Sequence, residues 1–160
     1  MPFVYSVVGT TPATNYTTHA TPGTEDPTVV LRQAVRGFDL QAIYVNGRES
    51  AATTITGISY IVRRWTTAGS GGTAITPAPR RVGTTASTTA ADKVSAITAG
   101  TVTGGFQLSF GCGKAGPGGW VARDADSAID VEGTSADELD INSLCGEASI
   151  KHYLSCEIAE

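Results

Sequence analysis

The sequence predicts an all-β protein: a single-domain β-sandwich, jelly-roll-like in its arrangement, with an extended N-terminal arm. Short runs of β-branched and apolar residues, enough for eight or nine short strands, alternate with turn signals spaced roughly 8–12 residues apart. Regular alternation of helices with strands is absent, which excludes the doubly wound α/β class. The length of 160 residues suits one domain. A jelly roll is one of the few arrangements that manage the edges of eight antiparallel strands.

The first part of the chain, residues 1–26, is predicted to be a strand followed by an arm. Residues 1–9 have an apolar strand pattern, and residues 10–26 are polar and interrupted by proline. Loops longer than about a dozen residues are usually functional or mobile. We therefore expect either an arm that lies across a neighbouring molecule or a flexible surface loop. In the first case the candidate partner contacts are Asn15, Tyr16 and His19.

Residues 27–160 form the predicted sandwich domain. Its strands are expected at residues 28–35, 38–45, 54–66, 73–76, 101–103, 106–110, 120–123, 128–132, 138–144 and 148–157. Every second residue from Phe38 to Tyr44 should lie on the more apolar face of its strand. In the last strand the even-numbered residues from 150 to 156 should likewise share one face.

Local signals predict how these strands are connected. Asn46-Gly47 indicates a hairpin turn, because both central residues of such a turn need positive φ. Glycine and serine at residues 68–72 indicate a flexible turn, and residues 145–147 a turn that joins the last two strands into a hairpin. Residues 84–94 are the one plausible helix, of a turn or two at most because threonine is frequent there.

Charge is scarce and its balance is acidic. Asp, Glu, Lys and Arg make up 16% of the chain and the formal net charge is −4. Nucleic-acid binders usually carry a basic face, so we expect no nucleic-acid partner. The pairs Arg63-Arg64 and Arg80-Arg81 lack interleaved aromatic residues. They are expected to be solvated charges at strand ends or contacts with an acidic protein surface.

Nothing in the sequence indicates export or a membrane. The N-terminus lacks the charged head of a signal peptide, and no apolar run approaches the roughly 18 residues of a membrane span. The three cysteines, Cys112, Cys145 and Cys156, form no CxxC pattern. We expect free, partly buried thiols and synthesis in a reducing cytoplasm.

One glycine motif resembles a nucleotide site but lacks its context. Residues 111–116 spell GxGxxG after a strand. A dinucleotide site needs a helix to begin there, whereas Pro117 and a second strand follow. We interpret residues 111–119 as a glycine-rich hairpin loop that could lie flat against a partner, with Lys114 as a candidate contact.

No catalytic or metal site is predicted. The only histidines are His19 and His152, and no GxSxG elbow occurs. His152 and Cys156 are four residues apart on a strand, about 13 Å, so they cannot hold one ion together. The acidic segment 124–140 allows at most a weak calcium site. We expect no enzyme activity and no cofactor.

The two tryptophans, Trp65 and Trp120, are predicted at strand ends. An exposed tryptophan could anchor a protein interface or stack on a sugar. Half-buried packing is the common alternative for such a side chain. We retain both residues as candidate partner contacts.

The middle and end of the chain resemble the capsid decoration, or cement, proteins of tailed bacteriophages. The resemblance lies in residues 58–77, ISYIVRRWTTAGSGGTAITP, in the Thr/Ala/Pro-rich connection 78–98, in GPGGW at 116–120 and in the acidic end 138–160. It covers about two-thirds of the chain. It implies a β-sandwich or jelly-roll virion protein, often a homotrimer, that clamps neighbouring major capsid protein subunits and has no active site.

Two functions are therefore expected from different classes. The first is a structural virion protein on the outer capsid surface, made in the host cytoplasm, with the major capsid protein and further copies of itself as partners. The alternative is a carbohydrate-binding β-sandwich of a phage fibre or receptor-binding protein. The alternative requires a solvent-exposed tryptophan flanked by Asp or Asn.

Overall fold

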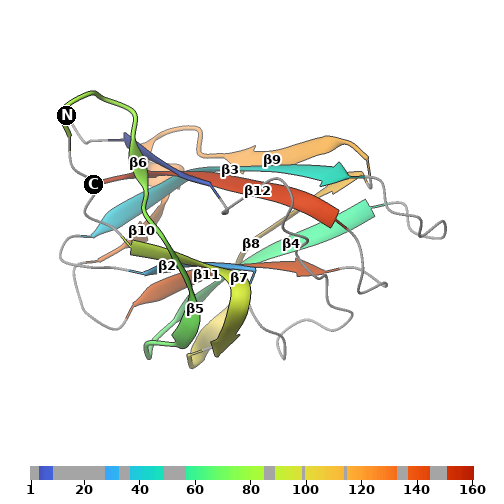
Figure 1. The fold of residues 1–160 in the computed structure, drawn as a ribbon, viewed down its shortest axis with the longest axis horizontal. Coiled ribbons are helices and arrows are strands. Elements are labelled where there is room, and N and C mark those ends of the chain that lie inside the picture. The colour runs from blue at the N-terminus through green and yellow to red at the C-terminus, as the bar shows by residue number, and fades with distance from the viewer. Residues whose placement is uncertain are drawn as a thin grey trace.

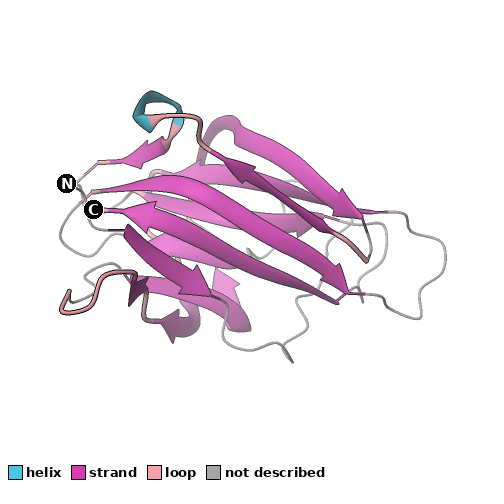
Figure 2. Cartoon of the chain, turned by 90° about the horizontal axis from the view of Figure 1, so that it is seen from above, coloured by secondary structure: helices cyan, strands magenta, loops and turns pink. Residues whose placement is uncertain are grey.

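The computed structural model describes residues 4–8, 28–32, 37–48, 57–84, 89–98, 100–113, 115–132, 137–144 and 151–160. These residues form one antiparallel sheet of 12 strands that curls over into two layers (Figures 1 and 2). Helical structure among them is restricted to the short 3-10 turn η1 (Ala125–Ser127). The all-β, sandwich-like prediction is confirmed. None of the described residues belongs to a helix that could cross a membrane.

Eight strands make up the two layers. In the upper layer of Figure 1 the order is β1 (Val4–Val8), β12 (Lys151–Ala159), β3 (Phe38–Arg48) and β9 (Pro117–Val121). In the lower layer the order is β2 (Val29–Arg32), β11 (Glu138–Leu144), β4 (Gly57–Trp65) and β8 (Val102–Gly113).

The pairing of these eight strands is that of a jelly roll. The first pairs with the last, β1 with β12, and the next pairs are β2 with β11, β3 with β9 and β4 with β8. Pairing of the first strand with the last, the second with the second-last and so on is what a rolled-up long hairpin produces. Each strand stays paired with its partner in the hairpin, and successive pairs lie in alternate layers. The jelly-roll prediction is therefore confirmed by strand order.

Four additional strands extend this framework. β7 (Thr89–Thr98) pairs with β2, β5 (Ser70–Ile75) with β7, β6 (Ala78–Pro79) with β1, and β10 (Ile129–Val131) with β3. Because β5 adjoins the lower layer and β6 the upper one, the chain from β5 to β6 crosses between the layers. Figure 1 shows this crossing in green. It closes one side of the sandwich.

The core between the layers follows strand alternation. In β2 and β11 every second side chain is apolar and fully buried, as in Leu31 and Leu139. In β12 the prediction is confirmed for the described side chains, because His152, Leu154 and Cys156 are buried while Tyr153 lies on the other face.

The predicted hairpin turn at Asn46-Gly47 is wrong. Both residues continue β3, where Asn46 lies opposite Tyr153 and Gly47 opposite His152. Neither has a positive φ. Pairing with β12 keeps this segment extended, so tertiary hydrogen bonding overrides the local turn signal.

Two further expectations are corrected. The plausible helix at 84–94 is a strand from Thr89 onward, where backbone pairing with β2 and β5 suits its β-branched residues. The last two strands do not form a hairpin, because β11 lies in the lower layer and β12 in the upper one. The predicted arm, residues 10–26, lies outside the described residues. Its preceding strand is present as β1.

The two layers are joined on one side through β8 and β9, which pair at Cys112 and Gly118. A Cβ at Gly118 would lie 2.5 Å from the Gly111 carbonyl oxygen and 2.6 Å from the Cys112 Cβ. Only a residue without a side chain permits this approach. The glycine-rich motif therefore has a structural role at the junction of the two layers.

We predict that Gly118→Ala destabilises the fold by about 1–3 kcal/mol, because the new methyl group must displace backbone. The matched control is Gly113→Ala, where a Cβ meets nothing within 4 Å. The control should change the free energy of unfolding by less than about 0.5 kcal/mol. Urea unfolding of both variants measures the difference, and equal stabilities would contradict this role of Gly118.

Candidate functional site

One surface of the sandwich is built by the side chains of the upper layer that point away from the core. We call it the outer face. Residues directly opposite one another on neighbouring strands point to the same side of a sheet. The register gives two rows that cross all four strands: Ser6, Glu157, Ala42 and Val121, and next to it Val8, Ser155, Tyr44 and Gly119.

The outer face carries unusual apolar exposure. Val8 is 55%, Tyr44 44% and Val121 59% exposed. These are three of the four large hydrophobic side chains that are exposed in the described part of the chain, the fourth being Val82. Single exposed hydrophobic residues are normal, but a cluster of them marks an interaction surface. The clustering on one face therefore identifies a candidate binding site.

The two rows that carry these apolar residues contain one charged residue and several small ones. Ser155 and Gly119 separate the larger side chains in their row. Glu157 is the charged residue of the other row, and its carboxylate is bound by the Arg80 guanidinium. Arg80 also donates a hydrogen bond from Nε to the Ser6 hydroxyl at 3.2 Å. A partner can therefore approach closely without stripping water from an uncompensated charge.

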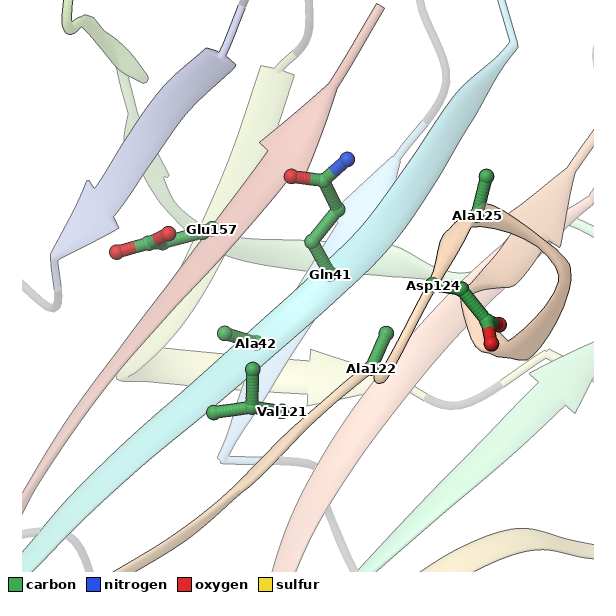
Figure 3. Close-up of a pocket in the computed structure, with 7 residues that line it drawn as sticks. All are labelled: Gln41, Ala42, Val121, Ala122, Asp124, Ala125 and Glu157. Atoms are coloured by element: carbon green, nitrogen blue, oxygen red, sulfur yellow. The ribbon is translucent and has the colours of Figure 1, made fainter.

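A hollow of about 270 Å³ adjoins the outer face (Figure 3). Its lining is Gln41, Ala42, Val121, Ala122, Asp124, Ala125 and Glu157. Figure 3 shows the Glu157 and Asp124 carboxylates on opposite sides of it. Asp124 accepts a hydrogen bond from the Ser127 backbone N–H at 2.9 Å, so it caps η1. The hollow is a small-residue depression with no converging catalytic groups.

The acidic segment brings together no metal site in the described residues, where no group of three or more potential ligands occurs. Asp130 of β10 lies directly opposite Asp39 of β3. Burial, together with the nearby Asp130 charge, raises the pKa of Asp39. Two opposed carboxylates alone do not make a cation site.

The far side of the lower layer is covered, in contrast to the outer face. Arg63, Trp65 and Asp140 point to that side and are at most 1% exposed. Arg63 donates from Nε to both oxygens of Asp140 at 3.0 Å, and Trp65 donates from Nε1 at 3.1 Å. Burial raises the pKa of Asp140 while the Arg63 contacts oppose that shift.

This buried cluster corrects two predictions. Arg63 is not a solvated strand-end charge, because β4 continues past it and Asp140 of β11 faces it across the sheet. Trp65 is not available as a partner contact, since it has no exposed surface and packs with Val30 and Ile97. Arg80 does remain exposed.

A second polar group lies inside the core and links the two layers. The Tyr60 hydroxyl of β4 and Nδ1 of His152 in β12 are 2.9 Å apart in a hydrogen bond. The Cys112 thiol donates to the same hydroxyl at 3.9 Å. Burial lowers the pKa of His152 to about 4 and raises the pKa of the Cys112 thiol. At neutral pH both groups are therefore uncharged, and the thiol is not activated as a nucleophile.

The other predicted contacts have mixed outcomes. Trp120 points inward opposite Ile43 and is partly buried against the core. Asn15, Tyr16, His19 and Lys114 lie outside the described residues.

The residues that sequence reasoning missed are Val8, Tyr44 and Val121. The reason is clearest in β3, where Glu157 pairs with Ala42 but Ile158 pairs with Leu40. Gln41 is thus an extra residue, a β-bulge, which reverses the faces of all residues that follow it. Tyr44 consequently points outward although the period of two from Phe38 places it inward. The sequence did contain one signal of this bulge: Ile43 is apolar although a regular period of two places it on the outward face.

Comparison with protein-family models, with curated proteins and with solved structures gave no match. The role of the outer face therefore has to be inferred from its own geometry.

We predict that Asp140→Ala costs about 3–5 kcal/mol of stability, because the Arg63 charge stays buried without its carboxylate. Arg80→Ala, which breaks an ion pair whose arginine is 56% exposed, should cost about 0–1 kcal/mol. Thermal or urea unfolding compares the two variants. Similar losses would mean that the buried pair contributes no more than the exposed one.

We predict that stability falls as the pH is lowered from about 6.5 towards 4. The unfolded chain protonates His152 near pH 6.5, whereas the folded state resists protonation until about pH 4. The unfolded state therefore binds more protons in this window, and the contribution lost is up to about 3 kcal/mol. In His152→Gln the slope of unfolding free energy against pH should be smaller. Equal slopes in the variant and the natural protein would be inconsistent with a neutral buried His152.

Proposed function

We propose that this protein is a structural virion protein of a tailed phage, a non-catalytic cement or decoration protein that binds the outer surface of the capsid lattice. The observation that carries the proposal is the outer face, where Val8, Tyr44 and Val121 are exposed together in two neighbouring rows whose one charged residue, Glu157, is paired with Arg80. A surface of this kind suits adhesion to another protein. The resemblance of residues 58–77 and 116–120 to phage cement proteins points to the capsid as that partner.

The interior supports a binding role over catalysis. The buried polar groups hydrogen-bond in two separate pairs within the fold, Tyr60 with His152 and Arg63 with Asp140. Such groups stabilise the sandwich and are directed away from solvent. A reaction would need a nucleophile and a base that converge on an accessible site, and the described residues around the hollow supply neither.

The size of the outer face favours repeated contacts. Four strands spaced about 4.8 Å apart, each contributing five residues of about 3.4 Å, cover roughly 320 Å² in projection. A standard stable interface buries about 800 Å² per partner. One copy therefore binds weakly through this face alone, and a homotrimer that presents several copies to a lattice gains affinity by avidity. This arithmetic supports self-association together with the major capsid protein as partner.

The carbohydrate-binding alternative has less support. Stacking on a sugar requires an exposed aromatic ring, but Trp65 is fully buried and Trp120 points towards the core. Tyr44 is the exposed aromatic residue of the outer face, and its row contains no carboxylate.

We predict that Tyr44→Ser combined with Val121→Ser reduces co-sedimentation with capsid shells at least tenfold. The shells are those of the phage that encodes the chain. The control is Val82→Ser, which removes the same kind of apolar side chain at a position that is 101% exposed and belongs to neither row of the outer face. The control should bind shells like the natural protein. If the wild-type protein does not co-sediment with shells, the cement function is refuted. If the double variant binds shells as well as the wild type, the outer face is not the capsid-binding surface.

A further inference from the structure

The core is incompletely covered along one side of the sandwich. Five inward-facing side chains pack against the core but stay partly exposed: Leu108, Phe110, Cys112, Trp120 and Ile129. They come from β8, β9 and β10. We call this line of residues the seam.

The exposure is specific to the seam, because the residues paired with it are buried. Phe110 lies opposite Tyr60, Trp120 opposite Ile43, and Ile129 opposite Leu40. Tyr60, Ile43 and Leu40 have no exposed surface. At these pairs, apolar side chains are therefore fully buried in β4 and β3 but partly exposed in the strands paired with them, β8, β9 and β10. What is missing at the seam is another strand.

The backbone at the seam is also open. β8 pairs with β4 regularly from Leu108 to Gly113 and with register shifts between Val102 and Leu108. Its other edge meets β9 at Cys112 alone within the part of the chain that the structure describes. In an antiparallel strand every second residue directs its N–H and C=O towards each edge. The described residues supply no strand partner for the outer edge of β8 from Val102 to Gly111.

The two ends of the sheet differ from the seam because they are blunted. β6 is two residues long and ends in Pro79. β5 contains a register shift after Gly71, and Gly71 and Gly72 both have positive φ. Short length, proline and bulges are devices that prevent strand addition at an edge. β8 is 12 residues long and has no proline, and although its register with β4 shifts between Val102 and Leu108, it is regular from Leu108 to Gly113.

We propose that the seam is a strand-addition site, at which an extended segment of a partner protein pairs with the free edge of β8. The segment alternates apolar and uncharged polar residues. Its apolar side chains lie against Leu108 and Phe110, and its polar ones lie beside the exposed Gln107 and Ser109. The identity of the donor as the major capsid protein rests on the proposed function, whereas the chemistry of the segment follows from β8 alone.

The two tryptophans provide the test. Trp65 is fully buried, so acrylamide quenching of fluorescence should report mainly on Trp120 at the seam. We expect capsid shells, and separately a nine-residue peptide of alternating valine and threonine, to reduce the quenching constant at least twofold. Hydrogen exchange should slow in parallel at alternate amides of residues 108–111, where β8 is regular. Trp120→Phe identifies the responding signal.

A lysine placed on the free edge should block the added strand. Ser109 is an exposed residue of β8, so Ser109→Lys places the charge beside the added strand. The control is Thr76→Lys, which adds the same charge at an exposed residue directly after β5. Only Ser109→Lys should abolish both changes. Shells that bind without protecting β8 would overturn the strand-addition site and leave the cement function standing. Protection of β8 by the peptide, with no binding to shells, would support the strand-addition site and overturn the cement function. No protection by either ligand would reject the strand-addition site.

Discussion

The close approach of β8 to β9 at Cys112 and Gly118 is the constraint on which the two-layered architecture depends. On the opposite side the layers are bridged by the chain from β5 to β6, whereas here one backbone pair joins them. The space for a side chain at Gly118 is occupied by backbone of β8. Beyond that pair β8 follows β4 and β9 follows β3, so the layers separate. The same junction that closes the jelly roll therefore also leaves the seam open.

The two layers also differ in whether the side that faces away from the core is covered by other parts of the chain. The lower layer buries Arg63, Asp140 and Trp65 under additional chain, at the desolvation cost that any buried ion pair carries. The upper layer has no such cover over Tyr44 and Val121. The fold thus buries charged side chains on one side and exposes apolar side chains on the other. The stability of the core does not require this asymmetry. The proposed function would account for the difference, because it gives the exposed side a partner.

Strand alternation and turn spacing were sufficient to predict the all-β sandwich, because both are local properties. Asn46-Gly47 and residues 84–94 were mispredicted since their conformations are decided by pairing with β12 and β2, which local propensity does not contain. Tyr44 was assigned to the wrong face because one bulge residue, Gln41, reverses the period. Trp65 and Arg63 were expected at the surface because the cover over the lower layer comes from distant segments such as Ile97.

The outer face and the seam meet at β9. Val121 of that strand points to the outer face, while its neighbour Trp120 points to the seam. Within the described residues, β9 beyond Gly118 has no strand partner on the side of β8. In the strand-addition proposal a partner segment on β8 would lie on this same side, so the two surfaces would form one interface around a strand edge. Such an interface is larger than the roughly 320 Å² of the outer face, and it combines backbone hydrogen bonds with apolar contacts. Affinity for a fixed lattice would thus arise from the shape of this edge, with no need for a charged patch.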